Sequence, residues 1–176
     1  MRRALSAFRS EAMSREEALR WLALACHNAH DVWDYDSWHV LATRFVQLAR
    51  DAGALAVLPI ALGSRTAAHV FAGEITAAAS LAEEQAAVLK AIGSERAPYA
   101  GLVLAAWQGR KAEASRLIEA TTKQVVPRGE GQWLTAVHWT SAVLYNGHAA
   151  LDVSTTPLPP DAHLHDGGLT ARDRRS

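Results

Sequence analysis

Glycines recur along this chain at the ends of apolar, alanine-rich segments, and their spacing is nearly regular. They form two series, one inside or just after the corner of a pair of segments (Gly73, Gly109 and Gly147) and one between pairs (Gly53, Gly93 and Gly129). Members of the first series are 36 and 38 residues apart, and members of the second are 40 and 36 apart. Because glycine readily adopts the left-handed conformation that ends many helices, each position predicts a helix stop. The chain is therefore expected to be an internal repeat of paired helices.

The clearest pair lies between Ala67 and Ile92, which reads AAHVFAGEITAAASLAEEQAAVLKAI. One apolar helix ends at Gly73, and an alanine-rich helix follows with apolar residues every three or four positions, the period of one helical face. Small side chains such as Ala78 and Ala79 let neighbouring backbones approach closely. Larger residues just before the corner glycines are expected to fill the gaps: Phe71, Trp107 and Tyr145.

Local signals predict about seven helices. Ser14 and Glu17 have the spacing of a capping box, and Asp36 is a suitable N-cap for the next helix. Pro59 fits only in the first turn of its helix, which favours a start near Val57. The expected helices cover about residues 15–30, 37–51, 55–72, 74–92, 98–108, 110–126 and 131–146. The predicted fold is all-α, a tetratricopeptide-like stack of antiparallel helix hairpins (an α-solenoid) whose hairpins bury their apolar stripes against one another.

The chain divides into three parts by texture. Residues 1–13 form a lead-in without a convincing apolar period, and residues 14–150 form the helical-repeat domain. Residues 151–176 are rich in proline, lack a helical stripe and end in a charged cluster, which predicts a disordered tail. The last helix is accordingly expected to end at Asn146, directly before Gly147.

Charge and cysteine content limit the classes of function. Eighteen basic residues balance eighteen acidic ones, so the broad positive field that nonspecific nucleic-acid binding needs is missing, and no direct nucleic-acid contact is expected. The single cysteine, Cys26, cannot form an intramolecular disulfide, which favours a reducing, cytoplasmic location. The longest weakly polar stretch, Ala52 to Leu62, contains Pro59, and neither a membrane span nor a signal peptide is predicted.

Two groups of histidines are candidates for a metal site. His163 and His165 lie next to Asp161 and Asp166 in the predicted tail, where no scaffold would fix ligand geometry, so they are interpreted as incidental. His27 and His30 are three residues apart and can share a helix face. No carboxylate is expected on that face, and a histidine at a hairpin corner, bonded to a backbone carbonyl, is the favoured interpretation.

The remaining candidates are a thiol and the tryptophans. Cys26 could act as a nucleophile with a distant histidine, but its place on an apolar stripe indicates a small core residue. Most of the six tryptophans are interpreted as core, with a minority on the concave binding face that a solenoid presents. No phosphate-binding loop, GxSxG or dinucleotide motif is present. The sequence therefore predicts no catalytic, cofactor-binding or metal-binding residue, and leaves the binding residues open.

The segment from about Arg15 to Ala150 resembles the helical-repeat region of large LuxR-type transcriptional regulators of actinobacteria, which are similar to the maltose regulator in layout. The resemblance lies in four phrases: the AG-E-AAA corner at Ala72 to Ala79, AAW-GR-AEA at Ala105 to Ala114, RGEG at Arg128 to Gly131, and AVLYNG at Ala142 to Gly147. Members of that family combine an N-terminal ATPase, a tetratricopeptide-like middle and a C-terminal helix-turn-helix. Neither the nucleotide-binding loops nor a basic recognition helix is found in this chain.

The resemblance implies a noncatalytic sensor or protein-interaction segment of a regulator, one that binds a protein partner or a small-molecule inducer without a cofactor. The break after Gly147 predicts a truncated fragment that lacks the ATPase and helix-turn-helix parts. The alternative is a free-standing tetratricopeptide-like adaptor that binds a protein segment in its groove. A more distant alternative is a small enzyme that uses the histidines.

Overall fold

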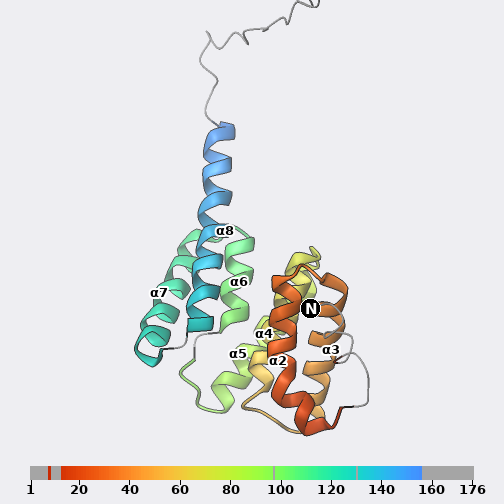
Figure 1. Cartoon of the computed structure of the whole chain (residues 1–176). Coiled ribbons are helices and arrows are strands. Elements are labelled where there is room, and N and C mark those ends of the chain that lie inside the picture. Colours follow the sequence, from red (N-terminus) through yellow and green to blue (C-terminus); the bar gives the residue numbers. More distant parts are fainter. Residues whose placement is uncertain (1–7, 9–12, 97, 130, 156–176) are drawn as a thin grey trace, which may run out of the picture.

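The computed structural model describes residues 8, 13–96, 98–129 and 131–155 of the 176-residue chain, and this part is all-α, as predicted, with seven helices and no strand (Figure 1). The helices are α2 (Arg15–Asp31), α3 (Tyr35–Asp51), α4 (Leu58–Phe71), α5 (Ile75–Ala91), α6 (Tyr99–Trp107), α7 (Lys111–Arg128) and α8 (Gly131–Thr155). None of the helices described is both long and apolar enough to cross a membrane.

The predicted helix starts at Ser14 and Val57 are confirmed. The Ser14 hydroxyl accepts a hydrogen bond from the Glu17 amide at 3.3 Å, and the Glu17 carboxylate accepts one from the Ser14 amide at 3.2 Å, which completes the capping box. Helix α4 begins at Leu58 with Val57 as its N-cap, so Pro59 lies in the first turn, where its missing amide hydrogen leaves no bond unmade.

Gly73 ends α4 in the predicted left-handed conformation, with φ at 76°. Its amide donates to the Val70 carbonyl at 3.0 Å, and the Glu74 amide donates to the His69 carbonyl at 2.9 Å, which satisfies carbonyls that the end of a helix leaves free. The same positive φ occurs at the other predicted stops up to residue 129: Gly53, Gly93, Gly109 and Gly129.

The predicted stop at Gly147 is wrong, because α8 continues through this residue to Thr155. A single glycine costs a helix only about 1 kcal/mol relative to alanine, and the good helix formers Ala149, Ala150 and Leu151 follow it. The helix thus extends five residues into the segment predicted as tail. Residues 156–176, with His163, His165 and their two aspartates, lie outside the described residues.

The predicted N-cap of α3 is also wrong. Asp34, not Asp36, caps this helix, and its carboxylate accepts a hydrogen bond from the Ser37 amide at 3.2 Å. The helix starts two residues earlier than predicted because Trp33 turns the chain sharply with φ at 53° and leaves only Asp34 between the corner and the first helical residue. Asp36 then lies in the first turn, where a carboxylate favours the helix dipole.

Each helix packs against the next one in the sequence, and a second set of contacts joins α2 to α4, α4 to α6 and α6 to α8. Within the described residues the backbones of α3, α5 and α7 do not approach one another in this way, although the Arg50 and Glu84 side chains join α3 and α5 at the surface. Helices α2, α4, α6 and α8 therefore form a continuous inner layer, and α3, α5 and α7 cover this layer from outside. One large buried cluster runs from α2 to α6, and a smaller one joins α6, α7 and α8.

A buried glutamine connects three of these helices. The Gln85 side chain of α5 donates to the Pro59 carbonyl at 2.6 Å and accepts from the Ala100 amide at 2.9 Å. The second bond satisfies a free amide in the first turn of α6, which has no side-chain cap of its own. A Cβ at Gly63 would lie 2.9 Å from the Gln85 amide nitrogen, so the glycine leaves the space that this side chain occupies.

Candidate binding pocket

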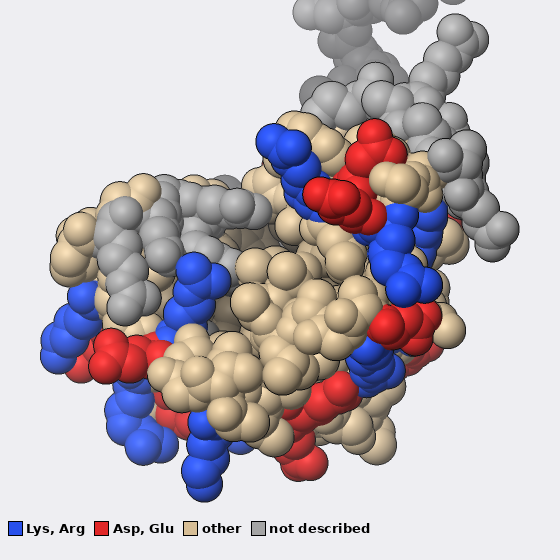
Figure 2. Space-filling model, turned by 90° about the horizontal axis from the view of Figure 1, so that it is seen from below, with Lys and Arg blue, Asp and Glu red and all other residues tan. Residues whose placement is uncertain are grey.

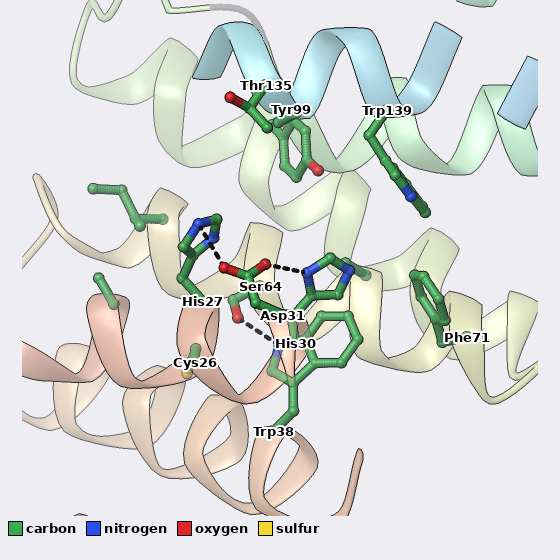
Figure 3. A pocket seen from close by; sticks show the side chains of 14 residues that line it. Cys26, His27, His30, Asp31, Trp38, Ser64, Phe71, Tyr99, Thr135 and Trp139 are labelled. Carbon is green, nitrogen blue, oxygen red and sulfur yellow. Dashed lines mark hydrogen bonds and ion pairs between the residues drawn. The ribbon is translucent and has the colours of Figure 1, made fainter. Parts of the chain in front are cut away.

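A cavity of about 330 Å³ lies on the inner layer (Figure 3). Side chains of α2, α4, α6 and α8 line it, together with Trp38 of α3. The lining residues are Ala23, Cys26, His27, His30, Asp31, Trp38, Ile60, Ser64, Ala67, Phe71, Tyr99, Thr135, Ala136 and Trp139. A concave, mainly apolar site with a few polar groups is typical of small-molecule binding.

One wall of the pocket is a cluster of aromatic rings. Phe71 is stacked on Trp139 with ring centres 5.5 Å apart and an interplanar angle of 19°. The centre of the His30 ring lies 5.6 Å from that of Phe71 and 4.8 Å from that of Trp38, both in edge-to-face arrangements. Beyond the lining residues, Trp107 extends the wall at 5.1 Å from Phe71. Four helices, α2, α3, α4 and α8, thus contribute rings to one continuous wall, and α6 prolongs it.

The aromatic wall is located where three helices end. His30 and Asp31 are the last residues of α2, Phe71 is the last residue of α4, and Trp107 is the last residue of α6. Their ring contacts bring these three C-terminal ends together. The large residues before the corner glycines were expected to fill gaps between helices. Phe71 and Trp107 instead remain partly exposed on the pocket side, and Tyr145 lies exposed within α8.

Asp31 lies between the two histidines of α2, as Figure 3 shows. Its carboxylate oxygens are 3.4 Å from His27 Nε2 and 3.3 Å from His30 Nδ1. The prediction that no carboxylate shares the face of these histidines is wrong. A spacing of four residues from His27 places Asp31 one helical turn further along the same face. Neither histidine ring hydrogen-bonds to a backbone carbonyl of the described residues. Both rings line the pocket instead.

Cys26 forms part of the pocket floor and is almost completely buried, which confirms the prediction of a small core residue. Burial raises the pKa of its thiol to about 12. The thiol therefore stays protonated near neutral pH, where a nucleophile needs the thiolate. Beside it, Ser64 accepts a hydrogen bond from the Trp38 indole at 3.1 Å, which holds that ring in place.

Tyr99 and Thr135 lie across the pocket from the carboxylate, on α6 and α8 (Figure 3). Burial raises the pKa of the Tyr99 hydroxyl to about 12, so it remains a neutral phenol at physiological pH. The pocket therefore has a charged end at Asp31 and an uncharged polar end at Tyr99. The sequence contained no signal for Tyr99 beyond its position directly after Pro98.

Trp33 stands beside the pocket in a backbone conformation that tryptophan rarely adopts. With φ at 53° it is the one non-glycine residue of the described chain at positive φ, and its side chain is 76% exposed. Its amide bonds to the His30 carbonyl at 3.0 Å and the following amide bonds to Ala29, the same pattern that Gly73 makes. The ring lies 6.4 Å from His30 and 6.2 Å from Phe71, two lining residues.

The tryptophans do not divide as expected, because only Trp38 is buried in the core among those whose side chains are described. Trp38 and Trp139 line the pocket, Trp33 and Trp107 lie next to its wall, and Trp21 is on the outside of α2, where Arg20 stacks over its ring at 5.3 Å. The side chain of Trp133 lies outside the described residues. More tryptophans therefore face the concave side than the predicted minority.

The charged side chains are dispersed over the exterior. In Figure 2 Lys and Arg lie beside Asp and Glu around the edge of one face, and the middle of that face consists of other residues. An example is the ion pair between Arg50 of α3 and Glu84 of α5, at 2.6 Å. Among the described residues no three His, Cys, Asp or Glu side chains are grouped so that they could hold a metal ion.

Comparison with known proteins adds no relative to this picture. No family model, curated protein or solved structure matches the chain.

Proposed function

We propose that this chain is a noncatalytic, tetratricopeptide-like helical-repeat module that binds a small organic molecule in the pocket of its inner layer. The repeated pattern of contacts supports the solenoid part of the proposal, because each pair of helices meets the next pair in the same way. The corner glycines, and the wider backbone separation among α3, α5 and α7 in the described residues, fit a stack that curves toward its inner layer.

The observation that carries the proposal is the pocket itself. Its volume of about 330 Å³ lies at the lower end of the range of roughly 300–1,000 Å³ for small-molecule sites. Its apolar rings supply contact area, and Asp31, Ser64 and Thr135 supply a few polar groups that can orient a ligand. The noncatalytic character is supported by Cys26, whose pKa of about 12 keeps the thiol unreactive.

A ligand in this pocket would join distant parts of the chain. Trp139 belongs to α8, yet its ring is 6.1 Å from His30 of α2 and 5.5 Å from Phe71 of α4. A bound molecule that contacts these rings favours one packing of α8 on the first two hairpins, which is how a sensor couples binding to a change of shape. The likeness of the corner phrases to LuxR-type regulators supports a sensor role within such a regulator, in the cytoplasm.

The alternative is a tetratricopeptide-like adaptor that binds a protein segment. One observation favours it: the aromatic wall continues past the pocket to Trp107, which also lines a second cavity of about 310 Å³ with Val143 and Leu144. A surface that extends along α6 and α8 in this way is long enough for an extended peptide rather than a compact ligand.

The test is ligand-dependent stability in a pair of matched variants. Ala136 lines the pocket on α8, whereas Ala142 lies exposed on the same helix, so Ala136→Trp fills the site and Ala142→Trp does not. A set of small organic molecules of varied charge is screened by thermal unfolding. A ligand at a hundred times its Kd should stabilise the wild type and Ala142→Trp by about 2.7 kcal/mol, and Ala136→Trp much less.

Two results would decide against the small-molecule function. If peptides bind saturably while no small molecule does, the adaptor is the correct interpretation. If a small molecule stabilises Ala136→Trp as much as the wild type, it binds elsewhere and the pocket is not the site.

A further inference from the structure

The pocket also indicates which class of molecule it binds. Among the described residues that line it, Asp31 is the one carboxylate and none is a Lys or an Arg. The two imidazole rings of His27 and His30 flank this carboxylate. An anionic ligand would find no fixed positive charge there, whereas a cation would find a carboxylate.

The rings strengthen this preference. The faces of aromatic rings carry partial negative charge and attract cations, with tryptophan the most effective. Trp38, Phe71 and Trp139 line the pocket, and Trp107 extends their wall. Such a wall can surround an ammonium group without hydrogen-bonding to it, as a quaternary ammonium requires.

The helix ends act in the same direction. The C-terminal end of a helix carries about half a negative elementary charge from its aligned peptide dipoles. Three such ends, those of α2, α4 and α6, come together at the aromatic wall. Asp31 at the end of α2 adds a full charge at a position where the dipole of its own helix disfavours it.

Trp33, at the edge of the pocket, has an unfavourable backbone conformation and an exposed side chain. It occupies the corner position that glycine occupies after α3, α4, α5 and α6, and its exposed ring gains little from burial. Backbone strain of this kind is concentrated at ligand sites. The ring is held next to His30 and Phe71, at the edge of the pocket.

We propose that the pocket binds an organic cation, a quaternary or protonated amine with an apolar body, whose charge lies against Asp31 and the rings of Phe71 and Trp139, with Trp33 as an additional aromatic contact at the rim. This inference rests on the proposed small-molecule function and narrows it to one chemical class. The neutral end of the pocket, at Tyr99 and Thr135, receives the uncharged part of the ligand.

The test compares two molecules of equal shape. Choline and its neutral isostere 3,3-dimethylbutan-1-ol differ in a single atom. This atom is a positively charged nitrogen in choline and a neutral carbon in the isostere. Their affinities for the full chain are measured by tryptophan fluorescence and calorimetry at about pH 8, where an imidazole is ordinarily neutral. Choline should bind at least about fivefold more tightly, the effect of a cation held by several rings and a carboxylate.

Three variants then locate the charge recognition. Asp31→Asn keeps the size of the side chain and should weaken choline at least about fivefold while leaving the isostere unchanged. Trp139→Leu removes a lining ring and should weaken choline by a larger factor than the isostere, because the isostere loses only apolar contact. Trp21→Leu removes an exposed ring of α2 that does not line the pocket, and it should leave both affinities unchanged. Asp31→Asn is expected to fold normally, because it removes a carboxylate from a helix C-terminus.

The outcomes separate this inference from the function on which it rests. Equal binding of choline and its isostere, both lost in Ala136→Trp, would overturn the preference for cations and leave the pocket as a small-molecule site. A screen in which only anions bind in the pocket would likewise overturn the preference for cations and leave the pocket as a small-molecule site. If no small molecule binds in the pocket at all, both the inference and the proposed function fail. Tighter choline binding that survives both Asp31→Asn and Trp139→Leu would place the cation elsewhere and overturn the inference.

Discussion

At the scale of single residues, Trp33 combines a strained left-handed backbone conformation with an exposed ring beside the pocket. Substitution by glycine, Trp33→Gly, should raise the free energy of unfolding by about 0.5–1 kcal/mol, because it relieves the left-handed strain and the exposed ring contributes little packing. Urea unfolding measures the change. Trp33→Ala is the control, since it removes the ring but keeps the strain, and it should not stabilise. A loss of stability in Trp33→Gly would show that the ring supports the fold.

Cys26 predicts how stability depends on alkaline pH. Its thiol has a pKa of about 12 in the folded chain, raised by burial from an ordinary value of 9.0. The unfolded chain thus loses this proton first. Stability from the thiol is complete below pH 9.0 and is lost as pH rises toward 12, by up to about 1.4 kcal/mol per pH unit.

The measurement for Cys26 is the slope of unfolding free energy against pH above 9.0, compared between the wild type and Cys26→Ala. The variant has no thiol to titrate, so its slope should be flatter, whatever its stability at neutral pH. Parallel slopes in the two proteins would mean that the thiol ionises equally easily in the folded chain and is not buried as described.

At the scale of elements, Gln85 is the hydrogen-bonding connection between α4, α5 and α6. Gln85→Leu should lower the free energy of unfolding by about 2–4 kcal/mol, because it leaves the buried Pro59 carbonyl and Ala100 amide without this partner. Gln47→Leu changes an exposed glutamine of α3 in the same way and should stay within about 0.5 kcal/mol of the wild type. Equal effects of the two substitutions would contradict the bridging role.

Close packing of α5 against α4 is tested with neighbouring alanines. Ala78 is completely buried at the start of α5, whereas Ala77 is exposed. Ala78→Leu should cost about 1–3 kcal/mol by overpacking, and Ala77→Leu should have little effect. Thermal unfolding of both variants is the measurement, and an unchanged melting temperature for Ala78→Leu would argue against tight contact between these helices.

The sequence predicted most helix ends because the signals for them are local. Ser14 and Glu17 cap each other within one turn, Pro59 can only be in a first turn, and Gly73 turns the chain by itself. The predictions failed where the residues beside an expected helix boundary determine whether the helix starts or continues. The corner formed by Trp33 moved the start of α3, and the alanines after Gly147 let α8 continue.

At the scale of the whole molecule, the glycine spacing correctly predicted that the described part of the chain is all-helical, but it contained no information on the pocket. Asp31 and Trp139 are far apart in the sequence and line the same pocket only because the Trp139 ring of α8 lies against His30 of α2 and Phe71 of α4. Each pocket residue has an ordinary role when taken alone, which is why the histidines were interpreted as corner residues. Spacing within one helix could have placed Asp31 beside His27, since the two are one turn apart.

The central claim is that an organic cation binds between α2, α4, α6 and α8, and the indole groups report on it directly. Choline is titrated into ¹⁵N-labelled full-length protein, and the indole N–H resonances are followed by NMR, assigned by single Trp→Phe substitutions. The account predicts saturable shifts for Trp38 and Trp139 with one Kd, and an unchanged Trp21 on the outer side of α2. Unchanged Trp38 and Trp139 resonances at saturating choline, with or without shifts at Trp21, would contradict it.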